Sequence, residues 1–163
     1  CPCGYAGDPR RRCRCLPNRL EAYRQRVSGP LVDRLDIRLR VPRLSRSELL
    51  DAAEGEPSAA IRDRVEAARD QQRRRFVEGS CRSNGEMSGA LARRSANLTR
   101  AAETVLGRAV DRFALSGRGF DRALKVARTI ADLDGSEAVD AQHLLEALSF
   151  RGEPLGEEES GVA

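Results

Sequence analysis

With 163 residues, the chain is long enough for one ordinary domain, or for the end of one domain followed by a small second one. Charged residues make up 33% of it and aromatic residues 4%, without a tryptophan, so a core must be built mainly from Leu, Val, Ala and Ile. A mean hydropathy of −0.53 and the lack of a long apolar run exclude a membrane-spanning segment, and no signal peptide is visible. We therefore expect a soluble, cytoplasmic protein.

The net charge of +4 is distributed unevenly along the chain. Residues 1–46 contain twelve arginines and four acidic residues, a net charge of +8, which leaves −4 for the remainder. Basic charge concentrated at one end favours a phosphate-rich partner, either a nucleotide or a nucleic acid. Because Lys125 is the only lysine, the arginine excess also fits a bias in codon usage, so where the arginines lie is more informative than how many there are.

Four cysteines in two close pairs open the chain: Cys1, Cys3, Cys13 and Cys15, in the pattern C-x-C-x₉-C-x-C. In a cytosolic protein such pairs bind metal more often than they form disulfides, and four thiolates suit a closed tetrahedral zinc site. The spacing differs from the usual C-x₂-C pair, which leaves open the alternative that this loop binds no metal. The arginines of the loop are candidates for DNA contacts or are simply solvated: Arg10, Arg11, Arg12 and Arg14.

A β-strand is predicted over residues 35–41, after a Gly-Pro turn. Apolar and charged residues alternate there with the period of a half-buried strand, and a proline ends the run because it cannot extend a sheet ladder. Arg34 precedes this strand on backbone that the turn and the strand would hold firmly, and an arginine so placed can serve a neighbouring phosphate. The alternative is a local ion pair of Arg34 with Asp33 or Asp36.

The other predicted elements are helices, over residues 18–28, 45–53, 58–78, 88–94, 99–114, 117–133 and 140–150. Ser45 and Glu48 have the spacing of a capping box, and Ser116 and Asp140 are expected to cap the last two helices. The polar loop over residues 79–88 is the best internal boundary. His143, the only histidine, is expected to be a half-exposed packing residue.

Four motifs follow one another along the chain: CPCG, SGPLVDRLDI, AARDQQRRRF and SGRGFDRALKVARTIADL. Together they resemble the magnesium-chelatase-like branch of the AAA+ ATPases, in particular the ComM/YifB family, over residues 1–152. The chain has no GxxxxGK[ST] phosphate loop and no apolar strand ending in paired acids. The resemblance is therefore to the C-terminal part of such an ATPase.

The resemblance implies the final strand region of an α/β AAA+ core followed by an all-α helical lid, a mostly helical fold. Residues 1–44 would be the end of the core, with the Cys-rich loop and an arginine-finger strand. Residues 45–84 would be linking helices and residues 85–152 the C-terminal lid. Residues 153–163 are acidic and expected to be disordered.

The resemblance also implies roles for individual arginines. Arg34 matches the position of an arginine finger, which acts in trans on the ATP of the next subunit. Ser116-Gly117-Arg118 matches the serine-x-arginine that opens the penultimate helix and carries sensor 2, which assigns Arg118, with Arg122 one turn further as the alternative. Interface roles are suggested for three residues of the AARDQQRRRF motif: Arg69, Gln72 and Arg75.

The implied function is that of an ATPase that binds ATP with Mg²⁺ between identical subunits of a hexameric ring and remodels DNA, as a helicase or in branch migration. One alternative is the ATPase subunit of magnesium chelatase. An alternative of another class is a zinc-stabilised nucleic-acid-binding module without ATPase activity. Because the Walker A and Walker B motifs are absent, these 163 residues alone are expected to be inactive as an ATPase, and no membrane partner is expected.

Overall fold

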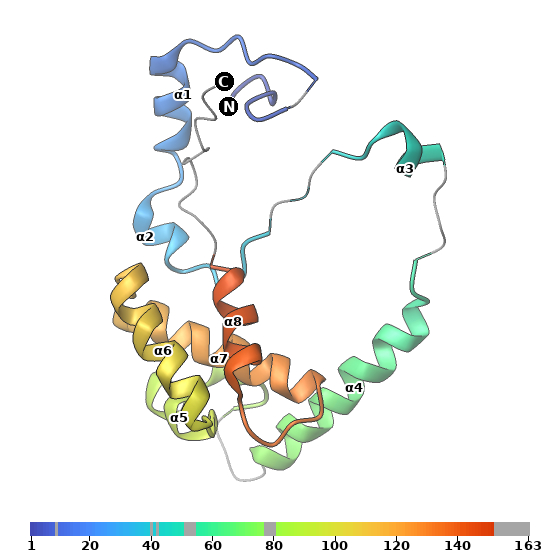
Figure 1. Ribbon diagram of the computed structural model, residues 1–163, viewed down its shortest axis with the longest axis vertical. Helices are drawn as coiled ribbons and strands as arrows, with labels where there is room; N and C mark the ends of the chain where they lie inside the picture. The colour runs from blue at the N-terminus through green and yellow to red at the C-terminus, as the bar shows by residue number, and fades with distance from the viewer. Residues whose placement is uncertain (9, 40, 42, 51–54, 77–80, 152–163) are drawn as a thin grey trace.

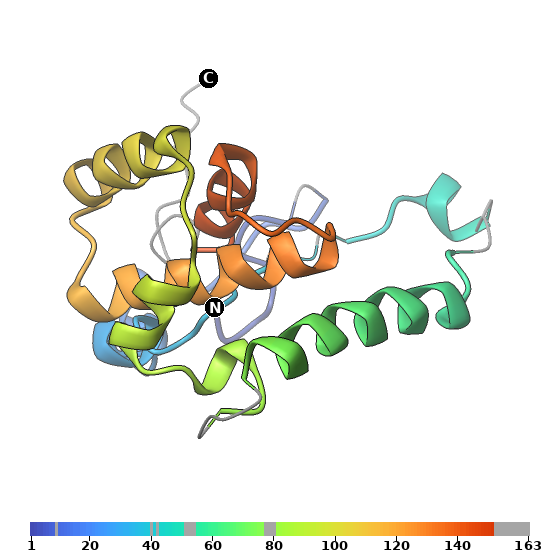
Figure 2. The same cartoon turned by 90° about the horizontal axis from the view of Figure 1, so that it is seen from below.

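The computed structural model describes residues 1–8, 10–39, 41, 43–50, 55–76 and 81–151. The regular elements of this part are α1 (Pro17–Arg24), α2 (Gly29–Val32), α3 (Arg46–Leu50), α4 (Ser58–Arg75), the 3-10 turn η1 (Asn84–Glu86), α5 (Gly89–Ser95), α6 (Arg100–Phe113), α7 (Gly117–Leu133) and α8 (Ala141–Ser149). Helices α5 to α8 form one bundle with α4 along its side, and α3 lies apart from it (Figures 1 and 2). The predicted tail over 153–163 falls outside the described residues.

Helix α7 is the centre of the bundle because its apolar residues recur at helical spacing. Leu124, Ala127 and Ala131 are each at most 1% exposed, and α4, α5, α8 and η1 all pack against this helix. The buried cluster continues through Met87, Ala92, Ala96, Leu106, Val126, Val139, Leu144 and Ala147. Burying one Leu-sized side chain contributes roughly 1.5–3 kcal/mol, so this cluster is what holds the helices together.

Side-chain caps fix where the helices of the bundle begin, as predicted. Ser116 Oγ accepts a hydrogen bond from the Gly119 N–H at 3.0 Å. Asp140 accepts from the N–H of His143 at 3.0 Å, and His143 Nδ1 accepts from the Asp140 N–H at 3.1 Å, which completes a capping box. Each cap contributes about 0.5–2 kcal/mol. Because its ring folds back into this box, His143 is buried at 6% exposure and is not the half-exposed residue that we expected.

The capping box predicted before α3 is also present. Ser45 Oγ accepts from the Glu48 N–H at 3.2 Å, and a Glu48 carboxylate oxygen accepts from the Ser45 N–H at 2.7 Å. Helix α1 differs from its prediction, since it begins at Pro17 without a side-chain cap and ends at Arg24. Proline is favoured at the first helical position because its fixed φ suits the helix. It also has no backbone N–H, and an N–H at this position would have no partner within the helix. No helix in the described ranges has the length and apolar character needed to span a membrane.

The strand predicted over residues 35–41 is not formed. Gly29–Val32 makes a short helix, α2, and the described residues that follow it through position 41 are neither helix nor strand. Leu35, Ile37 and Leu39 are 43%, 52% and 72% exposed. A strand needs a neighbour to satisfy its backbone groups and to cover its apolar face, and among the described residues this segment pairs with none. Elsewhere in the described chain β-pairing is limited to one bridge, between Leu98 and Val139.

A buried polar network joins α4 to α7. Asp132 has a fully buried side chain, and its carboxylate accepts hydrogen bonds from Arg75 of α4 at 2.9 and 2.5 Å. Arg128 Nε, at 3.0 Å, and Asn84 Nδ2, at 2.8 Å, donate to the same carboxylate. Gln72 is buried beside them and accepts from the Asn84 N–H at 3.3 Å. Gln72 and Arg75, for which the sequence suggested interface roles, thus have hydrogen-bond partners within the chain.

Candidate functional site

The segment after α2 docks on the bundle at the point where α7 begins. Asp33 Oδ2 accepts a hydrogen bond from Ser116 Oγ at 3.0 Å, and Asp33 Oδ1 accepts from Arg151 Nη2 at 3.1 Å. The Arg38 N–H then donates to the Phe150 carbonyl at 2.8 Å, at the end of α8. These bonds join residues that lie more than 80 positions apart in the sequence, so they define how residues 33–38 sit against the helical bundle (Figure 1).

A second contact lies one turn further along α7, where Arg122 forms an ion pair with Asp36. The Arg122 side chain is 28% exposed and that of Asp36 is 49% exposed, so water screens the pair in part. The pair nevertheless engages the guanidinium of Arg122 within the chain. Of the two sensor-2 candidates, Arg122 is thus the one whose charge already has a protein partner.

We call the contact of residues 33–38 with Ser116, Arg122 and Arg151 the junction. The sequence around Ser116 explains why its atoms are closely packed. Ser116 Oγ caps α7 and donates to Asp33 at the same time, which uses both the acceptor and the donor of one hydroxyl. A Cβ at Gly119 would lie 3.0 Å from Arg151 Nη2 and 3.3 Å from Ser116 Oγ. A side chain at position 119 would therefore crowd the two groups that hold Asp33.

Arg34 does not pair with its acidic neighbours, which was the alternative left open by the sequence. Asp33 is engaged by Ser116 and Arg151, and Asp36 by Arg122. Arg34 itself is exposed, and within the described part of the chain its side chain makes no ion pair or hydrogen bond. Its backbone is held, because the Arg34 N–H donates to the Leu31 carbonyl at 3.0 Å at the end of α2.

Arg118 occupies the second position of α7, two residues after Ser116, and is exposed. Its side chain likewise has no hydrogen bond or ion pair to the residues that the structure describes. A third arginine, Arg38, lies close to Arg151 and Asp33. Burial and then repulsion by Arg151 lower the pKa of Arg38, although attraction by Asp33 opposes them. The junction thus gathers several guanidinium groups around few carboxylates and presents Arg34 and Arg118 to solvent.

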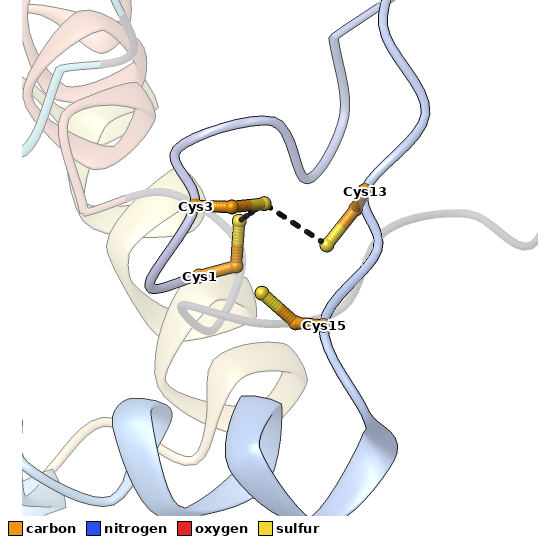
Figure 3. Close-up of side chains that lie close together, drawn as sticks. All are labelled: Cys1, Cys3, Cys13 and Cys15. Atoms are coloured by element: carbon orange, nitrogen blue, oxygen red, sulfur yellow. Dashed lines mark hydrogen bonds between the residues drawn. The ribbon is translucent and has the colours of Figure 1, made fainter.

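The four cysteines of the N-terminal loop do come together. Their sulfur atoms all lie within 4.8 Å of one another, and the Cys3 sulfur is 3.5 Å from those of Cys1 and Cys13 (Figure 3). Four sulfurs that are each ~2.3 Å from a central zinc ion would be about 3.8 Å apart at the corners of a tetrahedron. Number, type and spacing of the ligand atoms therefore fit zinc.

Hydrogen bonds and burial within the loop shift the pKa values of two of these thiols in opposite directions. The backbone N–H of Tyr5 and, beyond it, the thiols of Cys15 and Cys13 lower the pKa of Cys3 to about 7, although burial opposes them. The Cys15 N–H lowers the pKa of Cys13, but burial and the neighbouring thiols outweigh it and raise that pKa. Cys3 therefore ionises more readily than an ordinary thiol, and a bound cation would favour the thiolate form of a cysteine.

Asp8, whose side chain is 12% exposed, ties the loop together through its carboxylate. Its carboxylate accepts from the backbone N–H groups of Arg10 and Arg11 at 2.8 and 2.9 Å, and it pairs with Arg43 at 3.3 Å. The N–H of Arg10 and then that of Arg11 hold the pKa of Asp8 below its usual value against the effect of burial, with Arg43 adding to them. The side chains of Arg10, Arg11, Arg12 and Arg14 are exposed.

Comparison with known families places the chain. The model for the C-terminal region of magnesium chelatase subunit ChlI matches residues 55–151, more than half of the chain, and the model for magnesium chelatase subunit ChlI matches residues 1–49. The chain belongs to the magnesium chelatase ChlI family. The resemblance that the four motifs indicated is thereby confirmed.

Relatives of this chelatase-family chain include proteins of the ComM/YifB type. An uncharacterized protein of Mycobacterium tuberculosis is 41% identical over 151 residues, which is 93% of this chain and 29% of the relative. Competence protein ComM of Haemophilus influenzae is 34% identical over 139 residues, 85% of this chain and 26% of ComM. The uncharacterized protein YifB of Escherichia coli is 37% identical over 140 residues, 85% of this chain and 27% of YifB. The chain spans less than a third of the length of these relatives.

Sequence reasoning named Arg34, Arg118, Arg122 and the four cysteines as site residues. It did not identify the contacts that hold the segment around Arg34 against the helical bundle. Asp33 and Asp36 were considered only as neighbours of Arg34, and Ser116 only as a cap and as the serine of the serine-x-arginine motif. The sequence did carry one signal, the glycine on each side of Arg118, of which Gly119 leaves room for Arg151. The rest of the junction depends on contacts across more than 80 residues, which local spacing cannot indicate.

Proposed function

We propose that this chain is part of an AAA+-type ATPase that assembles as a ring of identical subunits and uses ATP and Mg²⁺ to remodel DNA. Residues 1–44 belong to the nucleotide-binding core, residues 45–84 link, and residues 85–152 form the lid. The observation that supports the proposal is the hydrogen bond of Ser116 to Asp33, because an exposed arginine stands close in sequence to each of them: Arg34 next to Asp33, and Arg118 two residues after Ser116. Similarity to a competence protein favours DNA over a porphyrin as the substrate.

Each arginine has a separate task in this proposal. Arg34 reaches the γ-phosphate bound by the next subunit and meets the charge that develops there during hydrolysis. Arg118, at the first turn of a lid helix, contacts the nucleotide of its own subunit. A guanidinium can form two parallel hydrogen bonds to phosphate oxygens, which couples the phosphate state to the angle of the lid. ATP supplies the phosphoryl group, and this chain supplies positive charge at defined places.

The assignment of Arg118 predicts a specific loss. In the ring-forming protein, Arg118→Ala is expected to lower ATP turnover roughly 10- to 100-fold, because a hydrogen bond to a charged group contributes about 1.5–3 kcal/mol. Ring assembly, measured by size-exclusion chromatography with light scattering, is expected to persist. Arg112→Ala, which removes another exposed arginine from the neighbouring helix α6, is the matched control and should turn over normally.

A different pattern would reassign sensor 2. If Arg118→Ala hydrolyses ATP at the normal rate while Arg122→Ala no longer closes its lid on ATP, Arg122 is the sensor. Lid closure can be followed by fluorescence transfer between a dye on the lid and one on the core. The ion pair of Arg122 with Asp36 argues against that outcome, because the pair would have to break for Arg122 to reach a nucleotide.

We further propose that Cys1, Cys3, Cys13 and Cys15 bind one structural zinc ion, which would fix the N-terminal loop. Protein purified without chelators is expected to contain about one zinc per chain, given four thiolate ligands. Replacing any of the four by serine should release the metal, since each supplies one of the ligands. Cys81→Ser is the matched control, because Cys81 is buried elsewhere in the chain and should not affect the zinc content. Elemental analysis that finds no zinc in the unaltered protein would end this assignment.

A further inference from the structure

The lid contact, and not a β-strand, fixes the position of Arg34. Residues 33–39 and 41 form no ladder in the structure, so sheet hydrogen bonds do not hold this segment. Apart from the bond of the Arg34 N–H to the Leu31 carbonyl at the end of α2, three groups hold it: Asp33 on one side of Arg34, and Asp36 and the Arg38 backbone on the other. All three attach to the lid, at the start of α7, one turn into α7, and at the end of α8 respectively.

These contacts are suited to transmit movement. Ser116, Arg118 and Arg122 belong to one continuous helix with its cap, and a helix moves as a rigid element. A shift of α7 that follows a phosphate at Arg118 must therefore carry Ser116 and Arg122 with it. Asp33 and Asp36 are bonded to those two residues, so the backbone on both sides of Arg34 shifts as well.

Arg151 strengthens the contact from the turn after α8. Its side chain is 12% exposed, and it donates to Asp33 Oδ1 while Ser116 donates to Oδ2, so both oxygens of one carboxylate are engaged. Hydrogen bonds to an ionised carboxylate are roughly twice as strong as neutral ones. The tight fit at Gly119 keeps Arg151 and Ser116 close together. Asp33 is thus held by α7 and by the turn after α8 together.

We propose that Asp33, Asp36, Ser116, Arg122 and Arg151 form a clamp that sets the position of Arg34 according to the angle of the lid. This proposal rests on the proposed function. It adds a way in which the nucleotide state of one subunit can affect hydrolysis at the nucleotide of the next subunit. The lid of one subunit senses its own ATP through Arg118, and the clamp passes that state to the Arg34 presented to the next subunit. The five are positioning residues, since they act on the reaction only through Arg34.

The clamp can be broken and rebuilt at the pair of Asp36 and Arg122. In the ring-forming protein, Asp36→Arg places like charges together and is expected to lower kcat for ATP roughly 10²-fold, because a displacement of ~1 Å of a positioned group costs about that much. KM for ATP should stay unchanged, since the phosphate loop that binds it is not altered. The charge-swapped protein, Asp36→Arg with Arg122→Asp, should recover most of kcat. Glu56→Arg, which breaks the exposed pair of Glu56 with Arg64 on α4, is the matched control and should leave kcat unchanged.

A clamp that acts through Arg34 has a further signature. In a protein that already carries Arg34→Ala, adding Asp36→Arg should cause no further loss, whereas independent effects would multiply. Arg151→Ala provides a second way to loosen the clamp and should show the same dependence on Arg34. A multiplied loss, a raised KM, or normal kcat in both Asp36→Arg and Arg151→Ala would overturn the clamp. If Arg34→Ala alone turns over normally, the arginine finger of the proposed function has failed, which is a separate result.

Discussion

Replacing Arg34 by alanine is expected to keep ATP binding and to lower ATP turnover by roughly 10³–10⁵-fold, the range found for arginine fingers. The reason is electrostatic, since the guanidinium meets negative charge that develops on the phosphoryl oxygens only as the bond breaks. The structure supports the assignment in one respect that the sequence left open: Arg34 is exposed and its acidic neighbours are engaged elsewhere. Turnover and nucleotide affinity should be measured on assembled rings of the protein that includes the phosphate loop.

Because a finger acts in trans, mixing provides the decisive control. Rings assembled from Arg34→Ala subunits and subunits with a disabled phosphate loop contain some interfaces with one intact loop and one intact finger. Those interfaces should restore part of the activity that neither variant has alone. If Arg34→Ala rings hydrolyse ATP normally, the finger lies elsewhere, and Arg24 or Arg26, next to the exposed end of α1, would be replaced next.

The helices of the bundle were predictable because their caps and apolar stripes lie within their own sequences. In α7 the cap at Ser116 and the apolar stripe through Leu124 and Ala127 agree on where the helix lies and which face is buried. The same holds at Asp140, where cap and core residues define α8. Such features act over three or four residues, so local spacing is sufficient to recognise them.

The strand over residues 35–41 was mispredicted because an alternating pattern is only one of the conditions for a strand. Alternating Leu35, Ile37 and Leu39 fit one face of a strand, but a strand also needs a neighbour for its hydrogen bonds. The exposure of these three side chains shows that the face is uncovered in this chain. Contacts such as that of Asp33 with Ser116 come from how the helices pack, and no local pattern contains that information.

The buried polar network between α4 and α7 could not be predicted from the sequence either. Arg75 follows two other arginines and looks like part of a solvated charged face, and Asp132 lies in the last turn of a predicted helix, where nothing in the sequence marks it as buried. Only the packing of α4 against α7 brings them together and buries the carboxylate of Asp132 completely. A motif with many charges can therefore serve the core of a bundle, which residue type alone does not reveal.

That network leads to the largest expected effect on stability. Asp132→Ala is expected to lower the free energy of unfolding by about 3–5 kcal/mol, because removing one partner of a buried ion pair leaves the other charge uncompensated. Here the stranded charge is mainly Arg128, whose side chain is 1% exposed. Asp70→Ala is the matched control, since it removes an aspartate that pairs with Arg73 on the exposed side of α4 and should cost about 0–1 kcal/mol. Chemical denaturation followed by circular dichroism measures both.

The pH dependence tests whether the charge of Asp132 is responsible. Burial alone raises the pKa of this carboxyl group, but hydrogen bonds from Arg75 and Asn84 and attraction by Arg128 outweigh it, so the pKa lies below its usual value of 3.8. A carboxyl group whose pKa is lower in the folded state stabilises the fold above the unfolded pKa, and this contribution is lost as the pH falls through the folded pKa. The difference in unfolding free energy between the unaltered protein and Asp132→Ala should therefore be constant near neutral pH and shrink below about pH 4. Other carboxyl groups with lowered pKa values, such as Asp8 and Asp140, are present in both proteins and cancel in the difference. A difference that is equally large at pH 7 and at pH 3 would mean that packing around Asp132, and not its charge, holds α4 to α7.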